Sequence, residues 1–442
     1  MAVNRLASAN TYSNALGNLA QRQTALSDMQ EKLTSGKKVV RASDDPTGAA
    51  QAERALTRIA RIATDQRALE AQRNTIANAE STLGDVGNAL QQFRELVVSA
   101  GNGTHTAAER ATIANQLQGL REQILGYANR TDTNGQPLFG ALASASVPFS
   151  GPSSTSPDYT FNGLAGQAST QETSIPGTLD GESAFMHQPS RDGVYNVSTS
   201  TIPTGRTLTT GNVTVTDSSK VTTATYKITF GPVTAGATAG TSSTSYTIEE
   251  IPAAGASPVW GTPNPPGPNL PPYTVGPFTV PDYPTGKAVS IPIADQAGPP
   301  AITGMPGLSL TITGTPAAGD VVTVDPRPSI FSVMDNAIRD IGSAANANAA
   351  TQAVGQAIYN LDIGMNRVSA IRGQAGDLLN RADRITSGQE TRSIQLEADR
   401  SRAEDMDMIK GVADFQSQQT AYQAALQSYA QVQKLSLFNY IS

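Results

Sequence analysis

The stretch TIANAESTLGDVGNALQQFRELVVSA, residues 75–100, decides the fold of this 442-residue chain. Apolar side chains recur in it at alternating spacings of three and four residues, which places them on one side of an α-helix. They are Ile76, Ala79, Leu83, Val86, Leu90, Phe93, Val97 and Ala100. The repeat lasts for more than three heptads, as in a coiled-coil seam. We therefore predict a long helix that must pack against another helix.

Helical patterns continue on both sides of this stretch. After a Gly-Asn-Gly break at 101–103, Thr106 and Glu109 have the spacing of a capping box that starts another helix. Nearer the N-terminus, Asp45 is predicted to cap a helix whose first residue is Pro46. The first helix is expected to end at Gly36, since glycine suits a left-handed position after a helix. Its stripe repeats every seven residues at Leu19, Leu26 and Leu33.

The C-terminal part of the chain mirrors the N-terminal part. Apolar stripes at helical spacing run through 330–341 and 354–385. The last helix carries its own stripe, which includes Val412, Phe415, Tyr422, Leu426 and Tyr429. Because a lone helix is marginal in water, each arm needs a partner, and the other arm is the obvious one. We predict that the two chain ends lie side by side.

A block of different composition separates the two arms. Of the 27 prolines, only Pro46 and Pro137 lie outside residues 141–328. Inside this block, β-branched residues alternate in short runs such as 225–230 and 308–313, which predicts strands. The proline-dense part, 252–300, is predicted to be extended loop. The fold class is therefore α+β: a long antiparallel helical coiled-coil rod with an inserted β-rich outer domain.

Composition excludes several classes of function. The chain has no cysteine, which excludes a disulfide framework, a thiol nucleophile and a zinc finger. A net charge of −6 argues against a nucleic-acid-binding face. No stretch approaches ~18 consecutive apolar residues, so we expect no membrane insertion. The N-terminus has no apolar core typical of a secretory signal, so no cleaved signal peptide is expected.

The residues that could carry chemistry have structural explanations. Asp44 and Asp45 form a carboxylate pair, the raw material of acid catalysis, but capping of the helix at Pro46 accounts for their spacing. His105 and His187 are the only histidines, and neither has a second histidine or a cysteine nearby. We predict no catalytic, cofactor-binding or metal-binding residues. Trp260 is interpreted as an anchor within its loop.

Three stretches of the arms resemble a known family. LTSGKKVVRASDDPTGAA (33–50) is similar to the N-terminal signature of the bacterial flagellin superfamily. NGQPLFGA (134–141) and SQQTAYQAALQSYAQVQKLSLFNYIS (417–442) resemble a narrower group, the hook-associated protein 3 type, which joins hook to filament in the flagellum.

The resemblance implies an architecture and a division of the chain. Both termini would pair as an inner coiled-coil layer of a hollow tube, with a helical rod outside it and the β-rich domain facing outward. The expected parts are 1–42 and 401–442 for the inner layer, 43–140 and 329–400 for the rod, and 141–328 for the outer domain. In this arrangement Gly36, Asp45 and Pro46 form the linker and helix cap. The assembly interface would comprise Leu19, Leu26, Leu33, Val412, Phe415, Tyr422, Leu426 and Tyr429.

The resemblance also implies partners and a location. The chain would form a ring of copies, meet the other hook-associated junction protein on one side and flagellin on the other, and bind an export chaperone through its C-terminal helix. It would be extracellular, at the hook–filament junction, after export through the flagellum's own type III channel. Two alternatives stay open: a filament flagellin, and an adhesin or surface antigen carried by the outer domain.

Overall fold

The computed structural model describes residues 2–142, 146–152, 158–201, 208–253, 273–294 and 304–441. The chain forms two compact units. The terminal unit consists of residues 1–69 and 383–442, and the central unit of residues 70–382. The long helices α2 (Pro46–Ala100) and α7 (Ala347–Glu404) contribute to both units.

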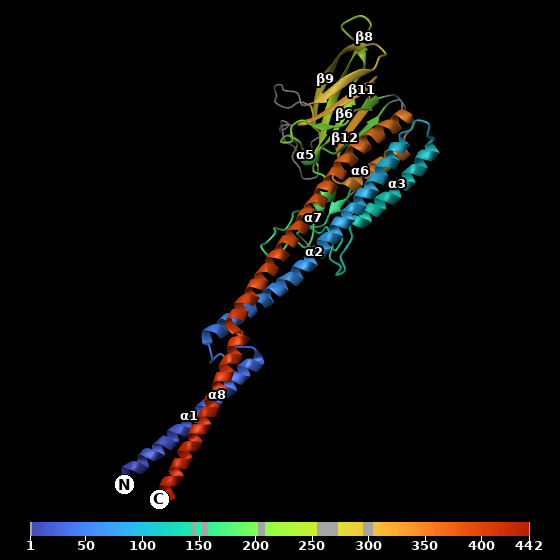
Figure 1. The fold of residues 1–442 in the computed structure, drawn as a ribbon. Helices are drawn as coiled ribbons and strands as arrows, with labels where there is room; N and C mark the ends of the chain where they lie inside the picture. Colours follow the sequence, from blue (N-terminus) through green and yellow to red (C-terminus); the bar gives the residue numbers. More distant parts are fainter. Residues whose placement is uncertain are drawn as a thin grey trace. The chain divides into compact units, whose positions relative to one another are not determined.

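Both chain ends belong to the terminal unit. Its helices α1 (Ala2–Ser35) and α8 (Met408–Ile441) lie side by side and antiparallel, with the two termini at the same end of the pair (Figure 1). α1 ends where Gly36 adopts a φ of +71°, a left-handed conformation that glycine takes without steric cost. The predicted pairing of the two arms is confirmed.

In the central unit, α2 and α7 pack along the seam that residues 75–100 predict. All eight apolar residues of that seam are buried, and α7 buries a stripe of its own at Leu361, Val368, Ile371, Ala375 and Ala382. Two ion pairs join the helices beside these stripes: Arg94 lies 2.8 Å from Asp362, and Arg372 lies 2.7 Å from Glu80. The rod therefore has a closed apolar core of its own.

A second helix pair completes the helical part of the central unit. α3 (Ala107–Ala128) starts with the predicted capping box, since the Thr106 hydroxyl accepts from the Glu109 N–H and the Glu109 carboxylate accepts from the Thr106 N–H. α6 (Ile330–Gly342) starts with a similar reciprocal cap. Arg121 on α3 lies 2.9 Å from Asp335 on α6, which fastens the two helices together.

The first part of the insert packs on these helices rather than on the sheets. It contains β1 (Phe149–Ser150), β2 (Thr160–Phe161), α4 (Gly181–Phe185) and α5 (Pro189–Asp192). The rings of Phe149 and Phe185 lie 5.2 Å apart between centroids. The ring of Phe331, on α6, lies 5.6 Å from the first and 5.8 Å from the second. This aromatic cluster makes Phe149 and Phe185 part of the helical core.

The larger sheet is antiparallel throughout. Its order is β3 (Tyr195–Ser200), β12 (Val321–Pro326), β6 (Thr225–Phe230) and β8 (Thr241–Ile251), with β7 (Thr234–Ala235) and β9 (Tyr273–Pro284) paired to β8. Tyr195 pairs with Pro326 in the β3–β12 register. The chain therefore enters and leaves the sheets through neighbouring strands.

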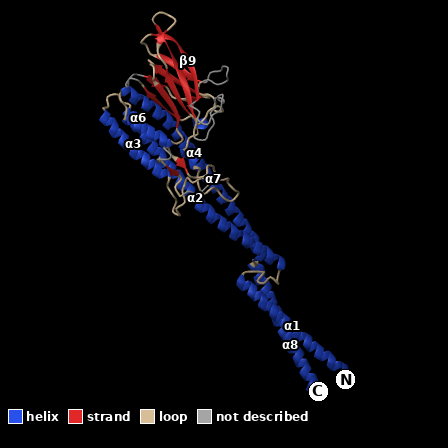
Figure 2. Ribbon diagram, turned by 180° about the vertical axis from the view of Figure 1, so that it is seen from behind, coloured by secondary structure: helices blue, strands red, loops and turns tan. Residues whose placement is uncertain are grey.

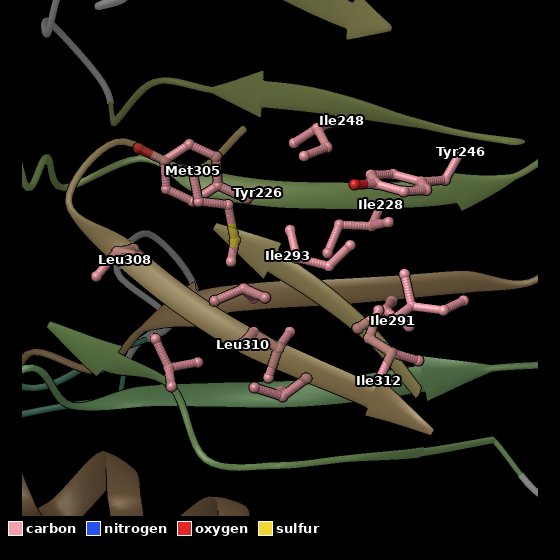
Figure 3. Packing of buried hydrophobic residues seen from close by; sticks show 14 of the residues in the cluster. Tyr226, Ile228, Tyr246, Ile248, Ile291, Ile293, Met305, Leu308, Leu310 and Ile312 are labelled. Atoms are coloured by element: carbon pink, nitrogen blue, oxygen red, sulfur yellow. The ribbon is translucent and has the colours of Figure 1, made fainter. Parts of the chain in front are cut away.

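A smaller sheet packs against the larger one. It consists of β10 (Val289–Ala294), β11 (Leu308–Gly314), β4 (Leu208–Thr210) and β5 (Thr214–Val215). Burial alternates along β6, β8 and β11, so each strand turns one face to a shared core. Side chains of both sheets meet in that core (Figure 3). Figure 2 shows the strands of these two sheets gathered at one end of the central unit.

The prediction of extended loop for 252–300 is wrong in part. β9 and β10 lie in this range; residues 254–272 and 295–300 are outside the described residues, and Trp260 with them. β9 pairs only with β8 and β10 only with β11 among the described strands. Edge strands tolerate proline because one row of their N–H groups has no ladder partner. Pro277 and Pro292 therefore do not prevent strand formation.

Candidate assembly surface

The predicted interface residues lie on the paired helices α1 and α8 of the terminal unit. On α1, the three leucines of the stripe keep part of their surface exposed. On α8, Phe415, Tyr422 and Tyr429 are half-buried, whereas Val412 exposes 44% and Leu426 exposes 39% of its surface. None of these eight residues is fully buried, although their spacing is that of a core seam.

The contrast with the α2 seam shows what the terminal pair lacks. Leu83 and Leu90 in that seam are 0% exposed. Complete burial of one aliphatic side chain contributes about 1.5–3 kcal/mol, so α1 and α8 leave much of their apolar free energy unused. A pair of helices covers only one side of each stripe. The α1–α8 pair is an incomplete core that additional helices would complete.

The uncovered side of α8 is wider than the sequence predicts. Ile409 is 87% exposed and Met408 is 48% exposed. Both lie one turn before Val412, so the three side chains share one surface. We call Met408, Ile409, Val412 and Leu426 the open edge of α8. Sequence reasoning missed Ile409. The signal that could have identified it is an isoleucine directly after a helix start, because Asp407 caps α8 by accepting from the N–H groups of Ile409 and Lys410.

The cap residues occupy the start of α2. Asp45 Oδ1 accepts from the N–H of Thr47 at 3.1 Å and of Gly48 at 3.0 Å, and Pro46 is the first helical residue. The Gly48 N–H, with help from the Thr47 hydroxyl, holds the pKa of the Asp45 carboxyl below its usual value. This is the geometry of an N-cap.

The Asp44 carboxylate also accepts hydrogen bonds from backbone N–H groups. Its Oδ2 accepts from the N–H groups of Val40 and Arg41, at 3.2 and 3.1 Å. These bonds, that from Arg41 above all, hold the pKa of the Asp44 carboxyl below its usual value. A general acid needs a raised pKa near neutral pH. The Asp44-Asp45 pair therefore shapes the linker and has the wrong electrostatics for acid catalysis.

The linker between α1 and α2 also closes the end of α7. The carbonyl of Glu404, the last residue of α7, accepts from the N–H of Lys38 at 2.8 Å, and Lys38 Nζ donates to the Arg402 carbonyl at 2.7 Å. The side chain of Lys37 forms an ion pair with Glu404. Linker residues thus cap a helix that lies far away in the sequence, and no local pattern predicts such a contact.

The surroundings of the two histidines are those of residues with a structural role. His187 is 4% exposed, and burial lowers its pKa to about 4, with Asp192 acting in the opposite direction. His105 Nδ1 lies 3.6 Å from the Glu109 carboxylate, beside the capping box of α3. Within the described residues, no three His, Asp or Glu side chains are grouped as metal ligands. Among the same residues, no helix is both long and apolar enough to cross a membrane.

Comparison with known families finds matches at both ends of the chain. The pattern for the bacterial flagellin N-terminal helical region matches residues 6–143, and that for the bacterial flagellin C-terminal helical region matches residues 358–441. Together the two matches cover half of the chain. They leave out the sheets and include α1 and α8.

Individual relatives agree with these matches. The chain is 33% identical over 147 residues to flagellar hook-associated protein 3 of Salmonella typhimurium, which is 33% of this chain and 46% of the relative. It is 35% identical over 148 residues to the protein of the same name from Escherichia coli, which is 31% of this chain and 44% of the relative. The alignments thus span less than half of the length of these relatives.

The fold has a solved counterpart. A crystal structure of flagellar hook-associated protein 3 from Legionella pneumophila superposes with a TM-score of 0.56 at 22% identity. The superposition covers 78% of this chain and 97% of that one. The α+β fold expected from the sequence, with its paired terminal helices and inserted strands, is confirmed.

Proposed function

Because the chain belongs to the bacterial flagellin family, we propose that it is a structural subunit of the flagellum that joins hook to filament. The observation that carries this proposal is the incomplete core of the α1–α8 pair, which only neighbouring subunits could close. The curated relatives named hook-associated protein 3 support the junction rather than the filament as its place.

The proposed assembly is a ring of copies in a hollow tube. α1 and α8 of each copy form the inner layer through the eight predicted interface residues and the open edge of α8. The other hook-associated junction protein lies on the hook side and flagellin on the filament side. Before assembly, an export chaperone binds the C-terminal helix. The subunit leaves the cell through the flagellar type III channel and works outside the cell.

The role we propose needs no cofactor and no enzymatic step. Asp44 and Asp45 are engaged by backbone N–H groups, and His187 is enclosed. The subunit contributes two binding surfaces, one that matches the hook side and one that matches the filament.

We also propose a refined division of the chain. The inner layer (1–42 and 401–442) and the rod (43–140 and 329–400) keep their predicted bounds. The aromatic cluster supports assigning residues 141–194 to the rod. The adjacent strands β3 and β12 support an outer domain that spans about 195–326.

Immunogold electron microscopy of isolated flagella tests the proposed place. Antibodies against residues 196–325 should label a single point between hook and filament. Flagella from a strain without the gene, complemented with an unrelated junction protein, serve as the control for specificity. Label along the whole filament would instead identify the chain as a flagellin and overturn the proposal.

A further inference from the structure

A groove opens between α2 and α7 within the terminal unit. Its volume is about 480 Å³, enough for several side chains of a partner. Buried Ala55, Leu396 and Ala403 line it together with exposed polar residues. The exposed lining residues are Gln51, Arg54, Arg58, Asp399 and Arg402. The groove therefore combines an apolar lining with a cationic rim.

Part of the positive charge on this rim has no ion-pair partner among the described residues. In the described part of the chain, Arg54 and Arg58 have no carboxylate within ion-pair distance, and neither does Arg61 one turn further along α2. Arg402 differs, because it forms an ion pair with Asp399. Arg54 and Arg58 are one turn apart on the helix, a spacing at which like charges repel and destabilise the helix. A carboxylate placed between them would remove this repulsion.

Guanidinium groups are well suited to such a partner. An arginine binds a carboxylate through two parallel N–H···O bonds, which gives direction as well as attraction. Partial enclosure by Ala55 and Leu396 keeps water away from one side of the contact. The groove thus fits a protein surface that presents both apolar side chains and carboxylates.

The charge distribution of the chain indicates where such a surface exists. The terminal unit has 16 Lys and Arg against 14 Asp and Glu, whereas residues 70–382 have 15 against 23. Six of the eight surplus acids of the central unit lie in residues 141–328, and its helices carry further exposed acids. Within the described ranges, Glu95 on α2 and Glu122 on α3 accept only from glutamine side chains one turn away, at 3.2 Å each.

We propose that the arginine groove binds exposed carboxylates on the acidic central unit of a second copy of this chain. The inference rests on the proposed function, because it requires an assembly in which copies touch. It adds a second contact, separate from the apolar layer of α1 and α8. In this contact the complementary charges of the two units set the register of one copy on the next.

Site-specific photocrosslinking in assembled flagella tests this contact. A photoreactive benzoylphenylalanine replaces Arg58 in the full-length chain, in a strain without the wild-type gene, and isolated flagella are irradiated. We expect an adduct of twice the 45.9 kDa chain, with the linked peptide inside 70–382. The same residue at Thr57, exposed on the next side of α2, is the matched control and should yield far less adduct. An adduct with flagellin or another protein, or one with a peptide from 1–69 or 383–442, would overturn the inference.

Charge variants provide an independent readout that does not depend on the crosslinker. Arg54→Lys with Arg58→Lys keeps the charge, whereas Arg54→Glu with Arg58→Glu reverses it. We expect about tenfold fewer filaments for the glutamate pair, since charge-assisted contacts are lost, and near-normal numbers for the lysine pair. Equal effects of both pairs would refute the role of charge. If both pairs have equal effects but the lysine variant still shows immunogold label at the junction, the groove contact is refuted and the proposed function is not. Failure of the inference is therefore distinguishable from failure of the proposed function.

Discussion

Replacing Leu426 by aspartate separates assembly from folding. Leu426 is 39% exposed, so in the single chain an aspartate there reaches water. The loss is about three fifths of the apolar contribution of a leucine, roughly 1–2 kcal/mol. In the proposed ring the same side chain would be enclosed by apolar neighbours, at a further cost of ~2–7 kcal/mol even as the neutral acid and more as the carboxylate. The variant should therefore fold and be exported, but fail to hold a filament.

Leu90→Asp is the matched control, because Leu90 is fully buried in the α2 seam. We expect it to lower the free energy of unfolding by about 4 kcal/mol or more. Thermal melting of both purified variants, followed by circular dichroism beside wild type, measures the folding effect. Counts of flagellin shed into the medium measure the assembly effect. The reasoning fails if Leu426→Asp lowers the melting temperature as much as Leu90→Asp does.

Three further predictions concern the insert, the cap and the buried histidine. Replacing 196–325 by a short Gly/Ser linker should leave a folded rod that restores motility to a null strain, whereas replacing 145–325 exposes Phe331 and should lower the melting temperature. Asp45→Ala should destabilise the chain at neutral pH, and Asp45→Asn should do so much less. Because the pKa of the Asp45 carboxyl is lowered in the folded state, the stability that this carboxylate contributes is lost as pH falls through that pKa. Urea unfolding at a series of pH values measures this loss. His187 has a folded-state pKa of about 4 and an unfolded one near 6.5, so stability should fall as pH drops between these values, by up to ~3 kcal/mol. His187→Phe should flatten that part of the stability curve, and an unchanged curve would contradict the assignment.

The helical part of the fold follows from local patterns. The seam between Ile76 and Ala100, the capping box at Thr106 and the glycine after α1 were all predictable, because each depends on residues a few positions apart. Strands such as β6 were predictable for the same reason. β9 and β10 were missed because proline content was weighed without strand position, and the cost of a proline depends on whether its strand is at an edge.

Contacts between distant residues could not be predicted in this way. Nothing near Lys38 in the sequence indicates that its N–H meets the carbonyl of Glu404. The ring of Phe331 likewise gives no sign that Phe149 and Phe185 will surround it. The open edge of α8 falls between these cases: the stripe is visible in the sequence, but how much of it α1 covers depends on how the two helices pack.

The capping of α7 by the linker has a consequence for the order of folding. Lys37 and Glu404 are separated by 367 positions, so the loop that their contact closes is nearly the whole chain. Contacts of such separation form slowly, because the entropy of loop closure must be overcome first. The hairpin of α2 and α3 can fold earlier, because its contacts are local: Arg130 and Asp85 are only 45 positions apart. A newly made chain would then spend its first moments with this hairpin formed and its ends unpaired. During that interval, α1 and α8 are as free to meet a neighbour as to meet each other.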